Sequence, residues 1–182
     1  MLSISDNPPV ATPGYESVAA MPGTWWVGHT KSRFEKAFAW DLYHQGVDYF
    51  LPMIERVRVS GGRKRRGMAA LFPSYVFFCG DDDSRYKALR TNRLCRAIEV
   101  QDQATLTDEL GQIELALTGK ADLDPYPFAA VGNRCRVTAG PCRGLQGTVV
   151  RRNGKARLVL EVTILGQGAF LDIETDLLEP VD

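Results

Sequence analysis

The pattern of apolar residues changes once along this 182-residue chain, and that change constrains the fold more than any other feature. Up to about residue 118, short apolar strand patterns alternate with patterns that repeat every three to four residues, as in helices. Beyond about residue 130 the helical spacing disappears, and short alternating segments separated by Gly and Asn remain. The sequence therefore predicts an α+β domain followed by a small all-β domain.

The first domain reads as a mixed α/β sandwich, in which helices flank an antiparallel sheet. Aromatic and β-branched runs give the strands, and the spacing of Phe34, Phe38 and Leu42 gives one stripe of the first helix. Ser32 and Glu35 have the spacing of a capping box, and Gly46 is suited to end that helix. The expected strands lie at 25–29, 47–53, 55–59, 71–79 and 97–100, and the expected helices begin near residues 32, 81 and 105.

Two segments lie outside these patterns. Residues 1–23 hold four of the ten prolines and almost no periodic apolar residues, so we expect a disordered tail. Residues 119–129 contain Pro125 and Pro127 and few core-type residues, which is typical of a linker. The predicted domains are therefore 24–118 and 130–182.

The second domain has the pattern of a small β-barrel. Strands are expected at 134–137, 147–151, 158–165 and 169–173. Asn153-Gly154 between two of them indicates a tight hairpin, because a type I′ turn needs a positive φ at both central residues.

Several function classes are disfavoured. The net charge is +0, so the molecule as a whole has no strong electrostatic preference for nucleic acid or membrane. The four cysteines form no C-x-x-C pair, so we expect no metal site. No P-loop or G-x-G-x-x-G occurs and neither His stands in a nucleophile–base motif, which argues against an enzyme and against a cofactor. The chain has no apolar run of about 20 residues and no signal-peptide pattern. We therefore expect a cytoplasmic protein without membrane contact, and a monomer as the simplest state.

Four motifs, in order along the chain, resemble the NusG/RfaH family of transcription elongation and antitermination factors. The segment 61–65, Gly-Gly-Arg-Lys-Arg, followed by 71–77, Leu-Phe-Pro-Ser-Tyr-Val-Phe, is similar to that family's glycine-basic loop and its L-F-P-G/N-Y-V-x-V strand. Residues 132–149 resemble the KOW motif, and 164–166, Ile-Leu-Gly, resemble the family's I-F-G turn. The resemblance covers roughly residues 24–181 and implies a NusG-type N-terminal domain joined to a small SH3-like KOW barrel.

For the first domain, the resemblance implies two binding surfaces. An apolar groove would take the clamp helices of the largest RNA polymerase subunit, with Tyr75 and Phe77 as contacts and Phe72 as a support. A basic surface would contact non-template or upstream DNA through phosphates. The residues assigned to DNA are Lys31, Arg33, Lys36, Arg63, Lys64, Arg65, Arg66 and Arg93.

For the barrel, the resemblance implies recruitment of a small-subunit ribosomal protein or the termination factor Rho through Leu165, Gly166 and Gln167. Leu165 and Gln167 replace the usual Phe and Arg of that turn, which removes an aromatic anchor and a charge. The departures favour an operon-specialised paralog that suppresses pausing or termination. A housekeeping NusG, or a KOW-type ribosome- or RNA-binding protein, remains the alternative.

Overall fold

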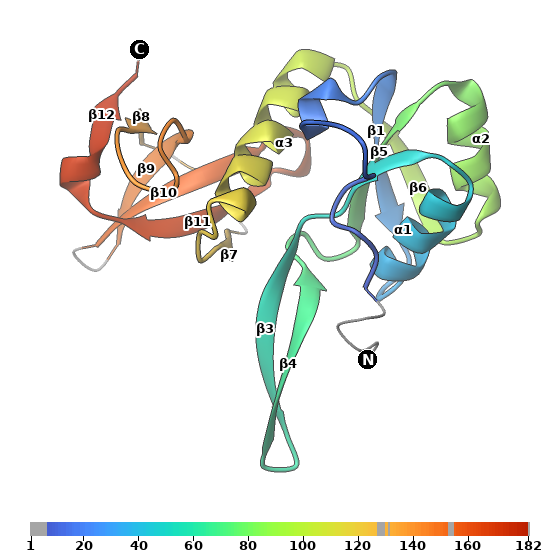
Figure 1. Cartoon of the computed structure of the whole chain (residues 1–182), viewed down its shortest axis with the longest axis horizontal. Coiled ribbons are helices and arrows are strands. Elements are labelled where there is room, and N and C mark those ends of the chain that lie inside the picture. The colour runs from blue at the N-terminus through green and yellow to red at the C-terminus, as the bar shows by residue number, and fades with distance from the viewer. Residues whose placement is uncertain (1–6, 127–129, 131, 153–154, 182) are drawn as a thin grey trace. The chain divides into compact units, whose positions relative to one another are not determined.

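The computed structural model describes residues 7–126, 130, 132–152 and 155–181, which form two compact units, Met1–Gln103 and Ala104–Asp182. The first unit combines helices with a four-stranded antiparallel sheet, and the second contains a six-stranded antiparallel sheet (Figure 1). The α+β class predicted from the sequence is thereby confirmed, with an all-β antiparallel region in the C-terminal part. In the described part of the chain, no helix is both long and apolar enough to cross a membrane.

The sheet of the first unit has the order β2-β5-β1-β6. Its strands are β1 (Thr24–Thr30), β2 (Asp48–Phe50), β5 (Tyr75–Gly80) and β6 (Leu94–Glu99). One face of the sheet carries Trp26 and Phe78, whose rings stack with their centroids 5.6 Å apart. Helices α1 (Glu35–His44) and α2 (Asp82–Arg90) pack on this face through a buried cluster that includes Phe38 and Ala88.

The helix ends follow the expected local chemistry only in part. The Asp81 side chain caps α2 by accepting from the Ser84 N–H (2.9 Å), and Gly46 follows α1 with a φ of +67°. The expected capping box at the start of α1 is absent. Phe34 is the N-cap without a side-chain cap bond, because the Glu35 carboxylate instead accepts from the backbone N–H of Ser74 (2.6 Å).

Strands β3 (Met53–Ser60) and β4 (Arg63–Ala70) form a separate two-stranded hairpin that projects from the first unit (Figure 1). The two-residue turn consists of Gly61 and Gly62, with φ of +57° and +76°. Positive φ at both central residues suits glycine and is typical of a type I′ turn, whose twist matches that of the flanking strands. The basic segment 63–66 therefore lies in a strand and not in a loop, which corrects the loop expected from the sequence.

The disordered tail expected over residues 1–23 is wrong for residues 7–23. The segment pairs with the edge of the sheet, where the Thr12 N–H donates to the Tyr49 carbonyl (3.1 Å) and the Leu51 N–H to the Val10 carbonyl (2.7 Å). Val18 is completely buried. The segment has too few apolar residues to fold alone, but it adds hydrogen-bonded backbone to an open edge of the sheet.

The second unit has the strand order β12-β8-β9-β10-β11-β7. The strands are β7 (Asp124–Tyr126), β8 (Asn133–Val137), β9 (Gln146–Arg152), β10 (Lys155–Val162), β11 (Gln167–Ile173) and β12 (Leu178–Pro180). Strands β9 and β10 pair from Arg152 opposite Lys155, while the Asn153-Gly154 turn predicted between them lies outside the described residues. Strand β7 and helix α3 (Gln103–Thr118) also belong to this unit, apart from the first residue of the helix, Gln103. The sequence instead assigned the helix to domain 24–118 and residues 119–129 to a linker.

Candidate functional site

Tyr75 occupies the start of β5 on the sheet face opposite to α1 and α2. Its paired residue on β1 is His29, and the two rings stack with centroids 5.1 Å apart and an interplanar angle of 25°. Both side chains are half-buried, so each combines a fixed orientation with an accessible edge. The His29–Tyr75 pair is therefore a partly accessible aromatic surface on this face.

Phe77 and Phe72, expected beside Tyr75 in the binding groove, are buried instead. Phe77 is 0% exposed and Phe72 is 1% exposed. Their rings meet edge to face with centroids 6.1 Å apart, and Phe77 also lies 6.4 Å from Phe50. Because β5 is an inner strand between β2 and β1, its middle residues are covered on both sides. The burial of these two rings argues against direct contact with a partner and makes them part of the core.

Three turns beside this pair hold non-glycine residues in the left-handed region. The φ values are +67° for Arg33, +68° for Ser74 and +56° for Asn92. Such a conformation costs of order 1–3 kcal/mol for most residues, less for Asn, and persists only where the surroundings impose it. Strain of this kind is often found at binding sites, so these turns make the region a candidate for one.

Backbone hydrogen bonds impose that conformation by joining the turns to the end of β1. The Thr30 N–H donates to the Ser74 carbonyl (2.8 Å), and the Lys31 N–H donates to the Arg93 carbonyl (2.9 Å). The Glu35 carboxylate completes the arrangement by accepting from Ser74. Segments distant in the sequence thus present Lys31, Arg33 and Tyr75 from one fixed frame.

The cations assigned to DNA do not all have the same role. Arg93 forms an ion pair with Asp41 (Nε–Oδ2 2.9 Å), and its guanidinium lies 5.1 Å from the centroid of the Phe34 ring. Because Asp41 and Phe34 both hold the guanidinium, Arg93 has a structural role and is less available for DNA. Lys31 is exposed and donates from Nζ to the Asn92 carbonyl (2.7 Å), while Arg33 is exposed on its strained turn.

Lys36 connects helix α1 to the hairpin. Its Nζ donates to the Met68 carbonyl on β4 (2.6 Å). Burial lowers the pKa of Lys36, and Glu35 raises it while the nearby Arg58 lowers it further. The position of Lys36 therefore extends the basic surface of the hairpin onto the first unit.

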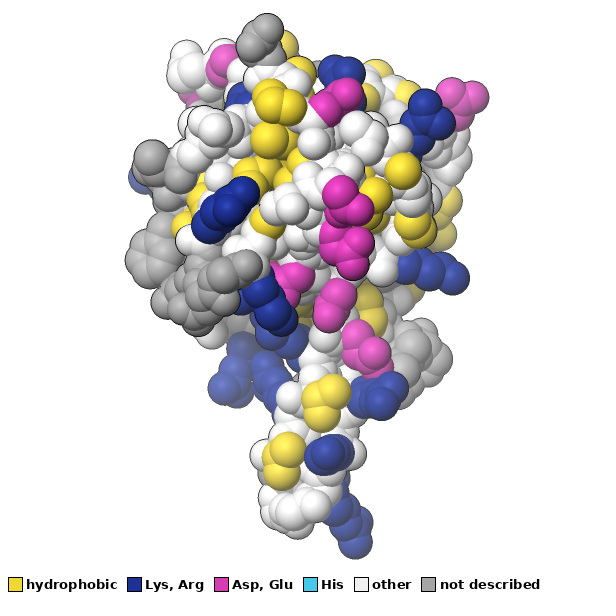
Figure 2. Space-filling view, turned by 90° about the vertical axis from the view of Figure 1, so that its left-hand side faces the viewer, with side chains coloured by type: hydrophobic (Ala, Val, Ile, Leu, Met, Phe, Trp, Pro, Cys, Tyr) yellow, Lys and Arg dark blue, Asp and Glu magenta, His cyan; other side chains and the backbone are white. Residues whose placement is uncertain are grey.

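The hairpin holds more positive charge than the sequence assignment included. Arg63, Lys64, Arg65 and Arg66 are all exposed on β4, and β3 adds Arg56 and Arg58, which the assignment missed. The Glu55-to-Val59 alternation was a usable signal, because alternate residues of a strand share a face. Figure 2 shows Lys and Arg side chains along the projecting hairpin.

The turn expected to bind a partner of the second domain lies between β10 and β11. Residues Thr163–Leu165 form a short 3-10 helix, and Gly166 ends it with a φ of +62°. Leu165 and Gln167 are half-buried, while Gly166 is exposed. The residue that anchors this turn, Glu109 on α3, was not identified from the sequence.

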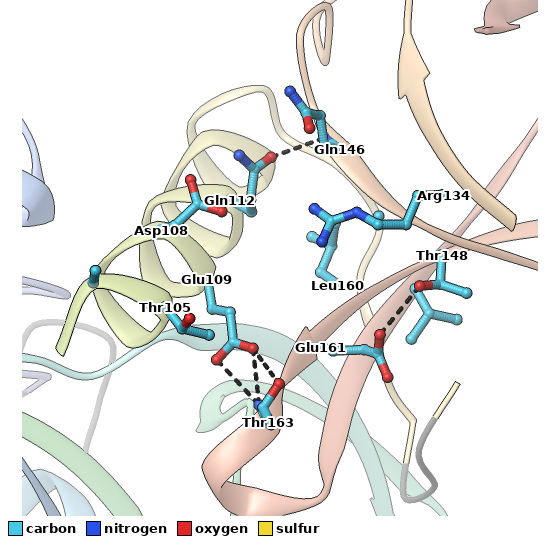
Figure 3. A pocket seen from close by; sticks show the side chains of 13 residues that line it. Thr105, Asp108, Glu109, Gln112, Arg134, Gln146, Thr148, Leu160, Glu161 and Thr163 are labelled. Carbon is cyan, nitrogen blue, oxygen red and sulfur yellow. Dashed lines mark hydrogen bonds between the residues drawn. The ribbon is translucent and has the colours of Figure 1, made fainter. Parts of the chain in front are cut away.

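A polar cavity of about 350 Å³ lies between α3 and the strands of the second unit (Figure 3). Asp108, Glu109 and Glu161 contribute carboxylates, and Arg134 extends into the same space. Glu161 accepts from the Thr148 hydroxyl (3.1 Å) and from the Ala130 N–H (2.9 Å). These contacts occupy the carboxylate structurally, and the described residues contain no cluster of three or more His, Cys, Asp or Glu suited to a metal ion.

The comparison with protein families concerns the N-terminal part of the chain. The family model described as transcription termination factor NusG matches residues 23–112, which include β1 to β6 and the first part of α3. A solved structure of domain interaction in Thermotoga maritima NusG aligns with 87% of this chain and 97% of that chain, at 17% sequence identity and a TM-score of 0.42. No curated protein sequence matches the chain. Over residues 23–112 the chain therefore contains an N-terminal region of the NusG family.

Proposed function

We propose that this NusG-family protein binds the clamp helices of the largest RNA polymerase subunit and suppresses pausing or termination. The observation that carries the polymerase contact is the His29–Tyr75 pair, half-buried and stacked on the sheet face that α1 and α2 leave to other contacts. Aromatic anchors held in place before binding lose little side-chain entropy when a partner docks. Phe72 and Phe77, which are buried, are not part of the proposed contact.

The effect on transcription follows from binding one polymerase state better than another. A factor that contacts the clamp and the opposite side of the cleft stabilises the closed clamp, whereas pausing needs it to open. Preferential binding to the closed state shifts the population towards elongation. No chemical step is required, and the site of action is the cytoplasm, where the polymerase works.

The basic surface contributes a DNA contact near the polymerase. Lys31 and Arg33 lie on the strained turns beside Tyr75, and the hairpin supplies the largest group of exposed cations. Phosphate contacts of this kind add affinity without sequence readout. The protein would therefore hold both the polymerase and nearby upstream or non-template DNA.

We further propose that the protein is an operon-specialised paralog. The exposed part of the β10–β11 turn offers Gly166 between two half-buried residues, Leu165 and Gln167, and so lacks a projecting aromatic or cationic group. Those are the residue types that dominate binding energy at interfaces. A housekeeping factor would instead bind a small-subunit ribosomal protein or Rho. When this protein is titrated with either of the two, we therefore expect no tight binding.

Retention on purified cognate RNA polymerase tests the polymerase contact. Tyr75→Ala should abolish retention, because it removes one of the two stacked, half-buried rings. Tyr86→Ala is the matched control: Tyr86 is exposed on α2, which covers the other sheet face. Equal retention of the wild type and Tyr75→Ala would contradict the assigned contact, and retention only on RNA would favour a KOW-type RNA-binding protein.

In-vitro transcription tests the functional effect. The wild-type protein should shorten pauses or increase read-through at terminators with the cognate polymerase, and Tyr75→Ala should lose the effect. Unchanged pausing and termination on every template, despite retention on the polymerase, would contradict the proposed function.

A further inference from the structure

The hairpin of β3 and β4 separates its charged side chains by face. Directly paired residues of an antiparallel ladder lie on the same face, and successive residues alternate. The register pairs Arg58 with Arg65 and Ser60 with Arg63. Arg56, two residues before Arg58 on the same strand, lies on the same face. One face, called here the arginine face, therefore carries Arg56, Arg58, Arg63 and Arg65.

The opposite face, called here the mixed face, has a different chemistry. It carries Lys64 and Arg66 opposite Val59 and Val57, which are 67% and 55% exposed. It also carries Glu55, whose carboxylate lies 4.0 Å from Arg66. Its positive charge is thus diluted by apolar side chains and by one carboxylate.

Arg58, Arg63 and Arg65 concentrate positive charge on the arginine face. Arg58, Arg63 and Arg65 are exposed, and no carboxylate in the described part of the chain forms an ion pair with any of the three. Arg58 and Arg65 stand directly opposite each other, an arrangement of like charges that destabilises a strand pair. Lys36 at the base of the hairpin adds another cation beside Arg58. A surface of this kind suits a polyanion, which removes the repulsion when it binds.

The shape of the hairpin favours duplex DNA over other polyanions. Each strand has eight residues, so the ribbon is about 26 Å long at the usual rise per residue. The major groove of B-DNA admits a two-stranded β-ribbon, whereas the major groove of duplex RNA is too deep and narrow for side chains to read. Proteins that bind single strands stack bases on aromatic rings, and residues 53–70 contain no Phe, Tyr or Trp.

We propose that the arginine face binds the phosphate backbone of duplex DNA, with the hairpin lying along the major groove. The inference rests on the DNA contact proposed above and specifies its face, its residues and the form of the nucleic acid. Arg58 and Arg65 form its centre because they are paired across the ribbon. The mixed face stays turned away from the duplex.

Fluorescence anisotropy with the full chain and a short labelled DNA duplex tests this assignment at several salt concentrations. The double variant R58Q/R65Q removes two charges from the arginine face, and K64Q/R66Q removes two from the mixed face of the same hairpin. Losing two phosphate contacts should lower the magnitude of the log K against log salt slope by about 1.8 and weaken binding roughly 10- to 60-fold at 0.1 M salt. K64Q/R66Q should retain most of the slope, and R63Q/R65Q should repeat the loss.

Three results would overturn the proposal. The first is equal loss of duplex affinity in R58Q/R65Q and K64Q/R66Q, since this would assign the effect to net charge alone. The second is tighter binding of the separated single strand with the same arginine dependence. The third is unchanged duplex binding in R58Q/R65Q together with lost retention on polymerase, which would make the face a protein contact. Retention on DNA-free polymerase, assayed with Tyr75→Ala in parallel, separates these results from failure of the polymerase contact itself.

Discussion

The Glu109 carboxylate on α3 accepts hydrogen bonds from both the backbone N–H and the hydroxyl of Thr163, with a distance of 3.0 Å from the amide nitrogen to Oε2. Thr163 is the first residue of the turn between β10 and β11. A second bond follows along the same helix, where the Gln112 side chain accepts from the Gln146 N–H (2.8 Å). The helix is therefore attached to the C-terminal sheet at two backbone positions.

Replacement of Glu109 should make stability depend less on pH. Burial raises the pKa of Glu109; Thr163 opposes this by hydrogen bonding, and Glu161 and Asp108 reinforce it. The native state then binds the proton more tightly than the unfolded state, so stability falls as pH rises from about 4.5 through the native pKa. Glu109→Gln keeps an acceptor for Thr163 without the charge. Its unfolding midpoint should rise relative to wild type between pH 4.5 and 7, and a pH-independent difference would contradict this. Asp122→Asn, which removes an exposed charge elsewhere in the same unit, is the control.

Phe77 should matter for stability and not for contact. Phe77→Ala should lower the free energy of unfolding by about 3–5 kcal/mol, as expected when a fully buried ring leaves a cavity. Phe77→Leu retains most of the apolar volume and should still bind polymerase, because the ring is covered. Denaturant unfolding and polymerase retention measure the two effects. Loss of retention in a stable Phe77→Leu protein would show that the ring itself contacts the partner.

Arg65→Glu should separate hairpin stability from DNA binding. The new carboxylate would stand opposite Arg58, and an opposite-charge pair at such a position contributes roughly 0.2–1 kcal/mol. The unfolding midpoint at low salt should stay the same or rise, while duplex affinity falls. Lys64→Glu makes the same charge change opposite Val59 on the mixed face and should reduce affinity less. Equal losses of affinity would contradict the distinction between the faces.

One of the four free thiols should react much faster than the other three. Cys95 is exposed, whereas Cys79 is fully buried, and burial with a smaller effect of Asp48 raises the pKa of Cys79 to about 12. Because the thiolate is the reactive form, one thiol should react rapidly with a disulfide reagent at pH 8, and Cys95→Ser should remove that phase. Rapid reaction of more than one thiol in the folded protein would contradict the assigned burial. Unfolding in guanidinium should expose all four.

Two glycines should respond oppositely to alanine. A Cβ at Gly147, within the KOW-like motif, would lie 2.4 Å from the Val159 carbonyl oxygen, so Gly147→Ala should destabilise the C-terminal sheet by about 1–3 kcal/mol. Gly111 on α3 has open space around its Cβ position, and Gly111→Ala should stabilise the helix by up to about 1 kcal/mol. Thermal unfolding distinguishes the two. Equal stability of Gly147→Ala and wild type would show that the two strands can move apart enough to accommodate the methyl group, which would contradict the expected clash.

The sequence by itself determined the features that depend on neighbouring residues. Alternation and helical spacing placed the four strands of the first sheet, β8 to β11 and α1 to α3, but not β4, β7 or β12. Two glycines in succession suit the turn at residues 61 and 62, because both have a positive φ. The motifs at residues 61–65 and 71–77 predicted the family whose model matches residues 23–112. Alternation also separated Tyr75 and Phe77 from Val76 and Phe78, although it did not say which of these side chains would be accessible.

The tertiary structure alone decided what depends on long-range contact. Phe77 is covered and Tyr75 half-exposed because an inner strand is buried at its middle and less so at its end. Residues 7–23 are ordered because they find a sheet edge to pair with, and the register of β3 with β4 gathers four arginines on one face. Pairing between segments follows from the burial and hydrogen bonding of the whole unit, which no local pattern encodes.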